Sequence, residues 1–132
     1  MQDDTLLHRQ VHPHFVDNEG RPTRQTFLLF PKDSGKLSLY NGEKWSAEYA
    51  FVNHTETLGL DSLGTLAITI LEIAQTKEDL DLELLEAIED NELFDGHVSL
   101  DQNHLMKNQQ KVVRTLLLQH AQLRDWTFRK AD

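Results

Sequence analysis

Cysteine is absent from this 132-residue chain, which also has only three prolines and no long uninterrupted apolar run. Without cysteine, the chain cannot form disulfides, zinc–thiolate sites or a cysteine nucleophile. The longest apolar-rich stretch, residues 58–74, contains Asp61 and Glu72, so it is not a transmembrane helix. Residues 1–4 are acidic rather than basic, and no apolar segment typical of a signal peptide follows them. We therefore expect a soluble, cytoplasmic protein that does not bind membranes.

The length and composition fit one globular unit. A chain of 132 residues is within the usual range of a single domain. Its hydrophobic content of 39% is modest but sufficient for a core, because chains of this size typically bury about two-thirds of their unfolded surface. We predict one domain that spans residues 1–132.

The negative charge is concentrated in the middle of the chain. The formal net charge is −9. Residues 1–40 are neutral, residues 41–101 contain fifteen acidic and two basic residues, and residues 102–132 carry a charge of +4. The acidic block argues against direct nucleic-acid binding, which requires lysine and arginine to neutralise phosphates. It favours a protein partner with a basic surface, although a solvated acidic surface without a partner is the simpler alternative.

Acidic residues are densest between positions 78 and 95. The candidate partner-binding residues are Glu78, Asp79, Asp81, Glu83, Glu86, Glu89, Asp90, Glu92 and Asp95. Such a surface resembles those with which inhibitor and immunity proteins cover basic grooves, because complementary charge accelerates encounter and excludes wrong partners. Pairing with the basic residues of the last helix is the alternative use of this charge.

Most strands are predicted in the first part of the chain. Alternating or β-branched apolar runs between turn residues indicate strands. The strands we expect are Leu6–Val11, Arg24–Phe30, Leu37–Tyr40, Thr65–Ile70, His97–Leu100 and Trp126–Arg129. A turn over residues 33–35 is expected to join the second and third of these strands as a hairpin.

Two helices and one ambiguous segment complete the prediction. Ser46 has the character of an N-cap for a helix that ends near His54. Residues 103–123 form the clearest helix, with an apolar stripe along one side. The stripe consists of Leu105, Val112, Leu116 and Leu123, and Met106, Val113, Leu117 and Ala121 widen it. In residues 76–92, alternation favours a strand, whereas a capping-box pattern from Thr76 favours a helix. We favour a short extended piece followed by a helical turn.

Early strands followed by a late helix predict the α+β class. The expected architecture is a small domain with a mainly antiparallel sheet and a long C-terminal helix packed on it.

Three short patterns in the first part of the chain point to a known family. They are His12-Pro13-x-Phe15, Arg21-x-Thr23-x-Gln25-x-Phe27 and Lys32-Asp33-x-Gly35-Lys36-Leu37-Ser38-x-Tyr40. With them, the chain resembles a small bacterial family for which no activity is established. The resemblance extends over most of the chain and implies a bacterial protein with the same domain boundaries. It implies no function, and the acidic segment 78–95 departs from the family pattern.

Residues for a catalytic site are present without the spacing of a known motif. The candidates are His12, Arg24, Lys32, Ser38 and His97. Either histidine is a possible base for the Ser38 hydroxyl, although the G-x-S-x-G pattern of many serine hydrolases is missing. The lysines around the turn at residues 33–35 suggest a phosphate site, but an ordinary turn needs the same residue types.

Two histidines are the only candidate metal ligands with suggestive spacing. His12 and His14 lie two residues apart, which would place them on the same side of a strand. No third ligand lies nearby in the sequence, so we predict no metal and no other cofactor.

The sequence therefore leads to two functional hypotheses. The first is an acidic accessory protein that docks on a larger bacterial protein, with an immunity, antitoxin or antiphage-defence role. The alternative is a small enzyme that acts on a nucleotide or another phosphate-bearing substrate through the five catalytic candidates.

Overall fold

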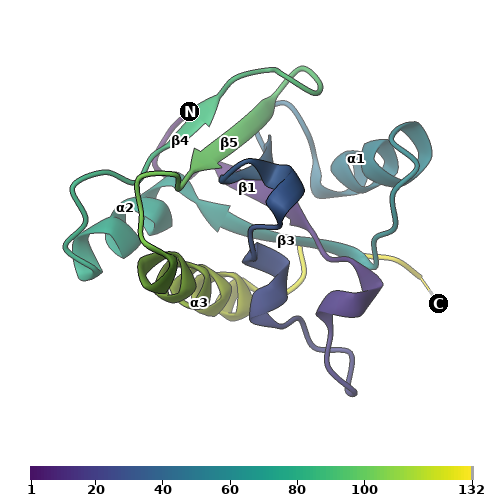
Figure 1. Cartoon of the computed structure of the whole chain (residues 1–132). Coiled ribbons are helices and arrows are strands. Elements are labelled where there is room, and N and C mark those ends of the chain that lie inside the picture. Colours follow the sequence, from purple (N-terminus) through teal and green to yellow (C-terminus); the bar gives the residue numbers. More distant parts are fainter. Residues whose placement is uncertain (132) are drawn as a thin grey trace.

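The computed structural model describes residues 1–131 and contains one six-stranded sheet in which all strand pairs are antiparallel (Figure 1). The strand order is β4-β5-β2-β1-β3-β6. The strands are β1 (Leu6–Gln10), β2 (Lys36–Asn41), β3 (Gly64–Thr69), β4 (Ala87–Glu89), β5 (His97–Asp101) and β6 (Phe128–Arg129). The helices are α1 (Ala47–Val52), α2 (Ile70–Asp79) and α3 (Lys107–Arg124), with a π-helical turn over Asn53–Thr57. The predicted α+β class is confirmed.

The central strands have one apolar and one polar face. His8, Tyr40 and His97 lie directly opposite one another across β1, β2 and β5. Because paired residues in antiparallel strands point to the same side, these three side chains share one face. Their neighbours Leu39 and Val98 point to the other face and are completely buried. The core therefore lies on one side of the sheet, whereas polar and aromatic side chains occupy the other.

Helices α2 and α3 cover the apolar face, as Figure 1 shows, and both contact β3. Within α3, Val113, Leu117 and Ala121 are fully buried. The predicted stripe is partly wrong, because Val112 is 44% exposed and Leu123 is 88% exposed. The residues that face the sheet lie one position further along the helix than Val112 and Leu116. The helix itself is confirmed, although it begins at Lys107 rather than near residue 103.

The predicted strand over Arg24–Phe30 is wrong. Residues Arg24–Phe27 form a 3₁₀ helix, and this segment packs against α3. Both edges of β2 are already paired, with β1 and with β5, so no position beside it remains for a hairpin partner. Phe27 instead inserts its ring into the core, where it is 1% exposed.

The interpretation of residues 76–92 is also wrong, because helix α2 continues where we expected an extended piece and strand β4 forms where we expected a helical turn. Helix α2 runs through Thr76 to Asp79, and its capping box is formed earlier, by Thr69 and Glu72. Thr76 lies inside the helix, where its hydroxyl donates to the Glu72 carbonyl over 2.8 Å. An irregular segment follows, and then the short strand β4. The acidic residues that alternate with leucine therefore belong to a helix end and a loop.

Glu72 also joins the two helices that cover the core. Its carboxylate accepts hydrogen bonds from both terminal nitrogens of Arg124, at 2.9 and 3.1 Å. Arg124 donates in addition to the backbone carbonyl of Ala67 in β3 over 2.9 Å. A bidentate ion pair of this kind fixes orientation as well as distance. Together with the hydrogen bond to Ala67, it holds α2, α3 and β3 together.

Within residues 1–131, no helix combines the length and the apolar character needed to cross a bilayer. This observation agrees with the interrupted hydropathy of residues 58–74.

Replacement of Leu117 by alanine is expected to lower the free energy of unfolding by about 2–5 kcal/mol, because it leaves a cavity in a closed core. Replacement of Leu123 in the same helix should change it by less than about 0.5 kcal/mol, because that side chain is largely in solvent. Denaturant unfolding of both variants measures the difference. Equal losses would contradict the orientation of α3 described above.

Candidate functional site

The acidic segment surrounds the open edge of the sheet. Strand β4 is the outermost strand and pairs only with β5. Six acidic residues lie in the segments just before and just after β4, are exposed and make no ion pair within residues 1–131. They are Glu78, Asp79, Asp81, Glu83, Glu86 and Glu92. We refer to β4 with these six residues as the acidic edge.

Large apolar side chains are exposed among these charges. Leu84 is 52% exposed, Ile88 in β4 is 55% exposed and Leu93 is 65% exposed. An exposed sheet edge with apolar side chains is normally protected by charge, since its free backbone groups can pair with another chain. The acidic edge thus combines charge, apolar contact area and open backbone hydrogen-bonding groups.

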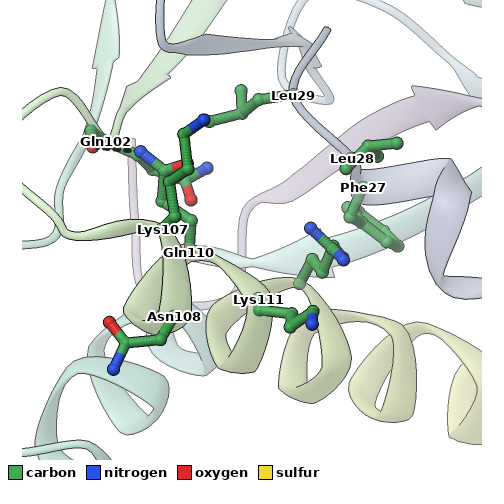
Figure 2. A pocket seen from close by; sticks show the side chains of 9 residues that line it. Phe27, Leu28, Leu29, Gln102, Lys107, Asn108, Gln110 and Lys111 are labelled. Atoms are coloured by element: carbon green, nitrogen blue, oxygen red, sulfur yellow. Dashed lines mark hydrogen bonds between the residues drawn. The ribbon is translucent and has the colours of Figure 1, made fainter.

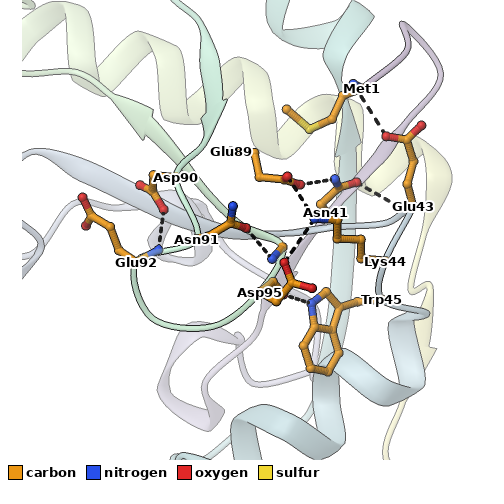
Figure 3. Close-up of polar contacts among 11 residues, drawn as sticks. Met1, Asn41, Glu43, Lys44, Trp45, Glu89, Asp90, Asn91, Glu92 and Asp95 are labelled. Carbon is orange, nitrogen blue, oxygen red and sulfur yellow. Dashed lines mark hydrogen bonds and ion pairs between the residues drawn. The ribbon is translucent and has the colours of Figure 1, made fainter.

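The other three acidic residues of the segment are engaged within the molecule (Figure 3). Lys44 binds both Glu89 and Asp95, with its Nζ atom 3.1 Å from each carboxylate. The hydrogen bonds to Asp95 and Glu89 raise the pKa of Lys44. Glu89 also accepts a hydrogen bond from the side chain of Asn41 in β2. Because these groups are partly solvated, each pair contributes little stability, but together they fix the loop after β4.

Close packing against Trp45 holds the far end of the same loop. The Trp45 indole donates to the backbone carbonyl of Asp95 over 2.7 Å. Gly96 has a φ of +88°, and a Cβ atom there would lie 2.8 Å from the Trp45 ring nitrogen. Its amide donates to the side chain of Asn91 over 2.8 Å. Only glycine fits this position, both for its backbone conformation and for the approach of the ring.

The polar face of the sheet carries a chain of hydrogen bonds behind the loop. His97 has its Nδ1 atom 2.5 Å from Asp90 Oδ1 and its Nε2 atom 3.1 Å from Ser38 Oγ. The Ser99 hydroxyl donates to the second oxygen of Asp90 over 2.5 Å. His97 is 2% exposed, and the Phe94 ring packs edge-on against it at 5.1 Å between centroids. Asp90 is thereby tied to β5 and, through His97, to β2.

The hydrogen bonds link Ser38, His97 and Asp90 in the same order as the residues of a serine–histidine–aspartate catalytic triad. A histidine held by a carboxylate on one nitrogen and facing a hydroxyl on the other can remove the hydroxyl proton. The same arrangement also serves a structural purpose, because it satisfies buried polar groups that would otherwise destabilise the fold. Two of the sequence candidates, Ser38 and His97, are thus within hydrogen-bonding distance.

Burial raises the pKa of Asp90, but the hydrogen bonds from His97 and Ser99 outweigh it and lower the pKa to about 2. The carboxylate is therefore charged at neutral pH. Because the pKa is lower in the folded chain than its ordinary value of 3.8, ionised Asp90 stabilises the fold above pH 4. That stabilisation is lost as the pH falls towards 2.

The remaining sequence candidates lie elsewhere. His12 and Lys32 line a shallow cavity of about 490 Å³, together with His14, Phe15 and Phe30. Arg24 starts the 3₁₀ helix beside α3. The five catalytic candidates therefore do not form one site: Ser38 and His97 form one pair, and His12 and Lys32 another.

The two histidines considered for a metal are close together. Their rings are 4.8 Å apart, and His12 Nδ1 accepts a hydrogen bond from the His14 amide over 3.0 Å. Among residues 1–131, no three histidine, aspartate or glutamate side chains gather in a way that could hold a metal ion.

The sequence does not predict the contacts that Asp90 and Arg9 make. Asp90 follows directly after the pair Glu89–Val98 of the β4–β5 hairpin, and its amide donates to the His97 carbonyl over 3.0 Å. Recognition of that hairpin would have predicted Asp90 beside His97. The half-buried Arg9 donates to the backbone carbonyls of Thr26 and Ser38 over 2.7 and 3.0 Å. No sequence pattern indicates this role.

Comparison with known proteins adds no functional information. No protein family, curated protein or solved structure matches the chain. The bacterial family resemblance stays a prediction, and the function has to be inferred from the residues themselves.

Asp90→Asn is expected to lower the free energy of unfolding at neutral pH by about 1–3 kcal/mol, because the buried network loses its charged acceptor. The gap between wild type and variant should close as the pH falls from 4 towards 2, since wild-type Asp90 becomes protonated in that window. Denaturant unfolding across this pH range measures it. Glu92→Gln removes a charge from the same loop and serves as the control, and a gap independent of pH would contradict the role given to Asp90.

Proposed function

We propose that this protein is an accessory binding protein that docks through its acidic edge on a larger bacterial protein with a basic surface. The observation that supports the proposal is the open strand β4, which is surrounded by six exposed acidic residues without internal partners. In contrast to Glu72, which pairs with Arg124, these six charges are available to a partner.

Charged and apolar residues contribute differently to binding at such an interface. The acidic residues attract a basic partner and exclude acidic ones, which mainly raises the association rate. Exposed ion pairs are worth at most about 1 kcal/mol each, so they cannot supply the affinity alone. Leu84, Ile88 and Leu93 offer the apolar contacts from which binding energy usually comes.

The internal contacts of the loop support the same role. Lys44, Trp45 and His97 hold the segment that follows β4 in one conformation. A surface that is already ordered loses less entropy on binding, which improves affinity without new contacts. In this proposal, the hydrogen bonds of His97 and Asp90 on the polar face keep the docking surface in its binding conformation.

The setting we propose is that of an immunity, antitoxin or antiphage-defence protein in the cytoplasm. A small acidic protein suits the neutralisation of a nuclease or toxin whose own substrate site is basic. The +4 charge of residues 102–132 does not belong to this surface.

Charge reversal of the acidic edge is expected to weaken partner binding. The double variant Glu83→Lys and Glu86→Lys should bind a partner captured from its native host at least about tenfold more weakly, because attraction is replaced by repulsion. Binding of the wild type should also fall as salt is raised. Capture with mass spectrometry identifies the partner, and titration of the purified pair gives the dissociation constants.

The matched control is the double variant Glu56→Lys and Asp61→Lys. Both residues are exposed, lie between α1 and β3, and make no ion pair within residues 1–131. The control raises the net charge by the same amount at a different place. If both variants bind equally well or equally poorly, the acidic edge is not the docking surface.

One observation favours an enzyme as the second candidate. The hydrogen-bonded series from Ser38 through His97 to Asp90 suits acyl or phosphoryl transfer. His97 would accept the Ser38 hydroxyl proton while the oxygen bonds to the acyl carbon or phosphorus, and Asp90 would stabilise the resulting imidazolium. The bond from that atom to the leaving group would then break, and the imidazolium would return the proton to the leaving group. Of the original candidates, only Ser38 and His97 belong to this site.

Labelling with a fluorophosphonate probe tests this second candidate. If the site is catalytic, Ser38 should carry the adduct, and His97→Gln should abolish labelling in a protein that still melts near the wild-type temperature. Ser46→Ala, which removes an exposed helix-capping serine, should leave labelling unchanged. An unlabelled Ser38 would indicate that the network is structural.

A further inference from the structure

A basic groove runs along α3 on the side of the molecule that faces the 3₁₀ segment (Figure 2). Its volume is about 450 Å³, which lies in the range of small-molecule sites. One wall is formed by α3, and the other by residues 27–29, which lie within the segment that the sequence predicted as a strand and include the end of the 3₁₀ helix.

Three cations of α3 line the groove. Lys107, Lys111 and Arg114 are spaced by four and three residues, so they lie on one side of the helix. They cover about 10 Å along the helix axis. Within residues 1–131, none of their three side chains forms an ion pair or a hydrogen bond with the protein.

Arg114 is the most confined of the three. Its Nε atom is buried and has no hydrogen-bond partner, which is unusual for a strong donor. Burial lowers the pKa of Arg114, and the positive charge of Arg24 lowers it further. The groove therefore gathers mutually repelling positive charges in a protein whose net charge is −9.

No acidic side chain lines the groove. Its other lining residues are amides, including Asn108 and Gln110, and the apolar residues Leu28 and Leu29. The Gln110 amide is oriented by a 3.0 Å hydrogen bond to the backbone carbonyl of Gln102. An anion would relieve the repulsion between the three cations, while the leucines would contact an organic group.

We propose that this groove binds a small organic polyphosphate, of the chemical class of nucleoside triphosphates. Three cations in a row suit a chain of phosphates, and the adjoining apolar wall suits the group that carries the chain. The proposal concerns a surface separate from the acidic edge and does not depend on the docking function.

The test is isothermal titration of the full-length protein with ATP at low ionic strength without divalent cations. We expect saturable binding at one site. The double variant Lys107→Gln and Lys111→Gln should bind about tenfold more weakly, a loss of ~1.4 kcal/mol. Both lysines are exposed, so the variant should keep the wild-type melting temperature. Inorganic tripolyphosphate should bind more weakly than ATP, because it cannot contact the leucine wall.

The matched control is the double variant Lys36→Gln and Lys130→Gln, which removes the same charge outside the groove. Its affinity for ATP should stay within about twofold of the wild type, since neither lysine lines the groove. An equal loss in both double variants would show diffuse attraction and overturn the proposal. Absence of saturable ATP binding would overturn the proposal too. If tripolyphosphate bound as tightly as ATP, Leu28 and Leu29 would not contribute to binding, and the proposed organic ligand would be wrong.

Discussion

The pairing of β5 with β2 on one side and β4 on the other decides the layout of this protein. It places Val98 and Leu100 in the core and turns His97 to the opposite face, between Ser38 and Asp90. It also leaves β4 as the terminal strand of the sheet. The buried polar network and the exposed acidic edge are thus consequences of one arrangement of strands, because the residues of a strand alternate between faces.

The sequence predicts those elements whose local pattern and tertiary environment agree. The strand over Leu37–Tyr40 and the Ser46 cap follow from such patterns and are confirmed. The strand over Arg24–Phe30 fails because its composition suits a sheet in which no position is free. In α3, two apolar stripes lie side by side, and only the shape of the neighbouring sheet determines that Leu117 rather than Leu116 is fully buried.

The candidate site is predictable to a smaller extent. Residue types alone brought Ser38 and His97 together as a possible base and hydroxyl, and the structure places them 3.1 Å apart. Asp90 was assigned to the acidic surface, because a carboxylate in an acidic run gives no local sign of a buried partner. Its position beside His97 depends on the register of a hairpin whose first strand, β4, has only three residues.

In the folded protein, the acidic segment and the basic residues of α3 stay separate and do not neutralise each other through ion pairs. Pairing between the basic residues of α3 and the acidic segment is the alternative that the sequence offers, but Arg124 pairs with Glu72. Among the lysines and arginines of residues 1–131, only Lys44 pairs with residues of that segment. Ion pairs that stabilise the fold therefore involve other residues than the six unpaired acids of the acidic edge and the three cations of the basic groove. Charges without an internal partner can be replaced at little cost in stability. Substitution at either surface consequently measures binding separately from folding.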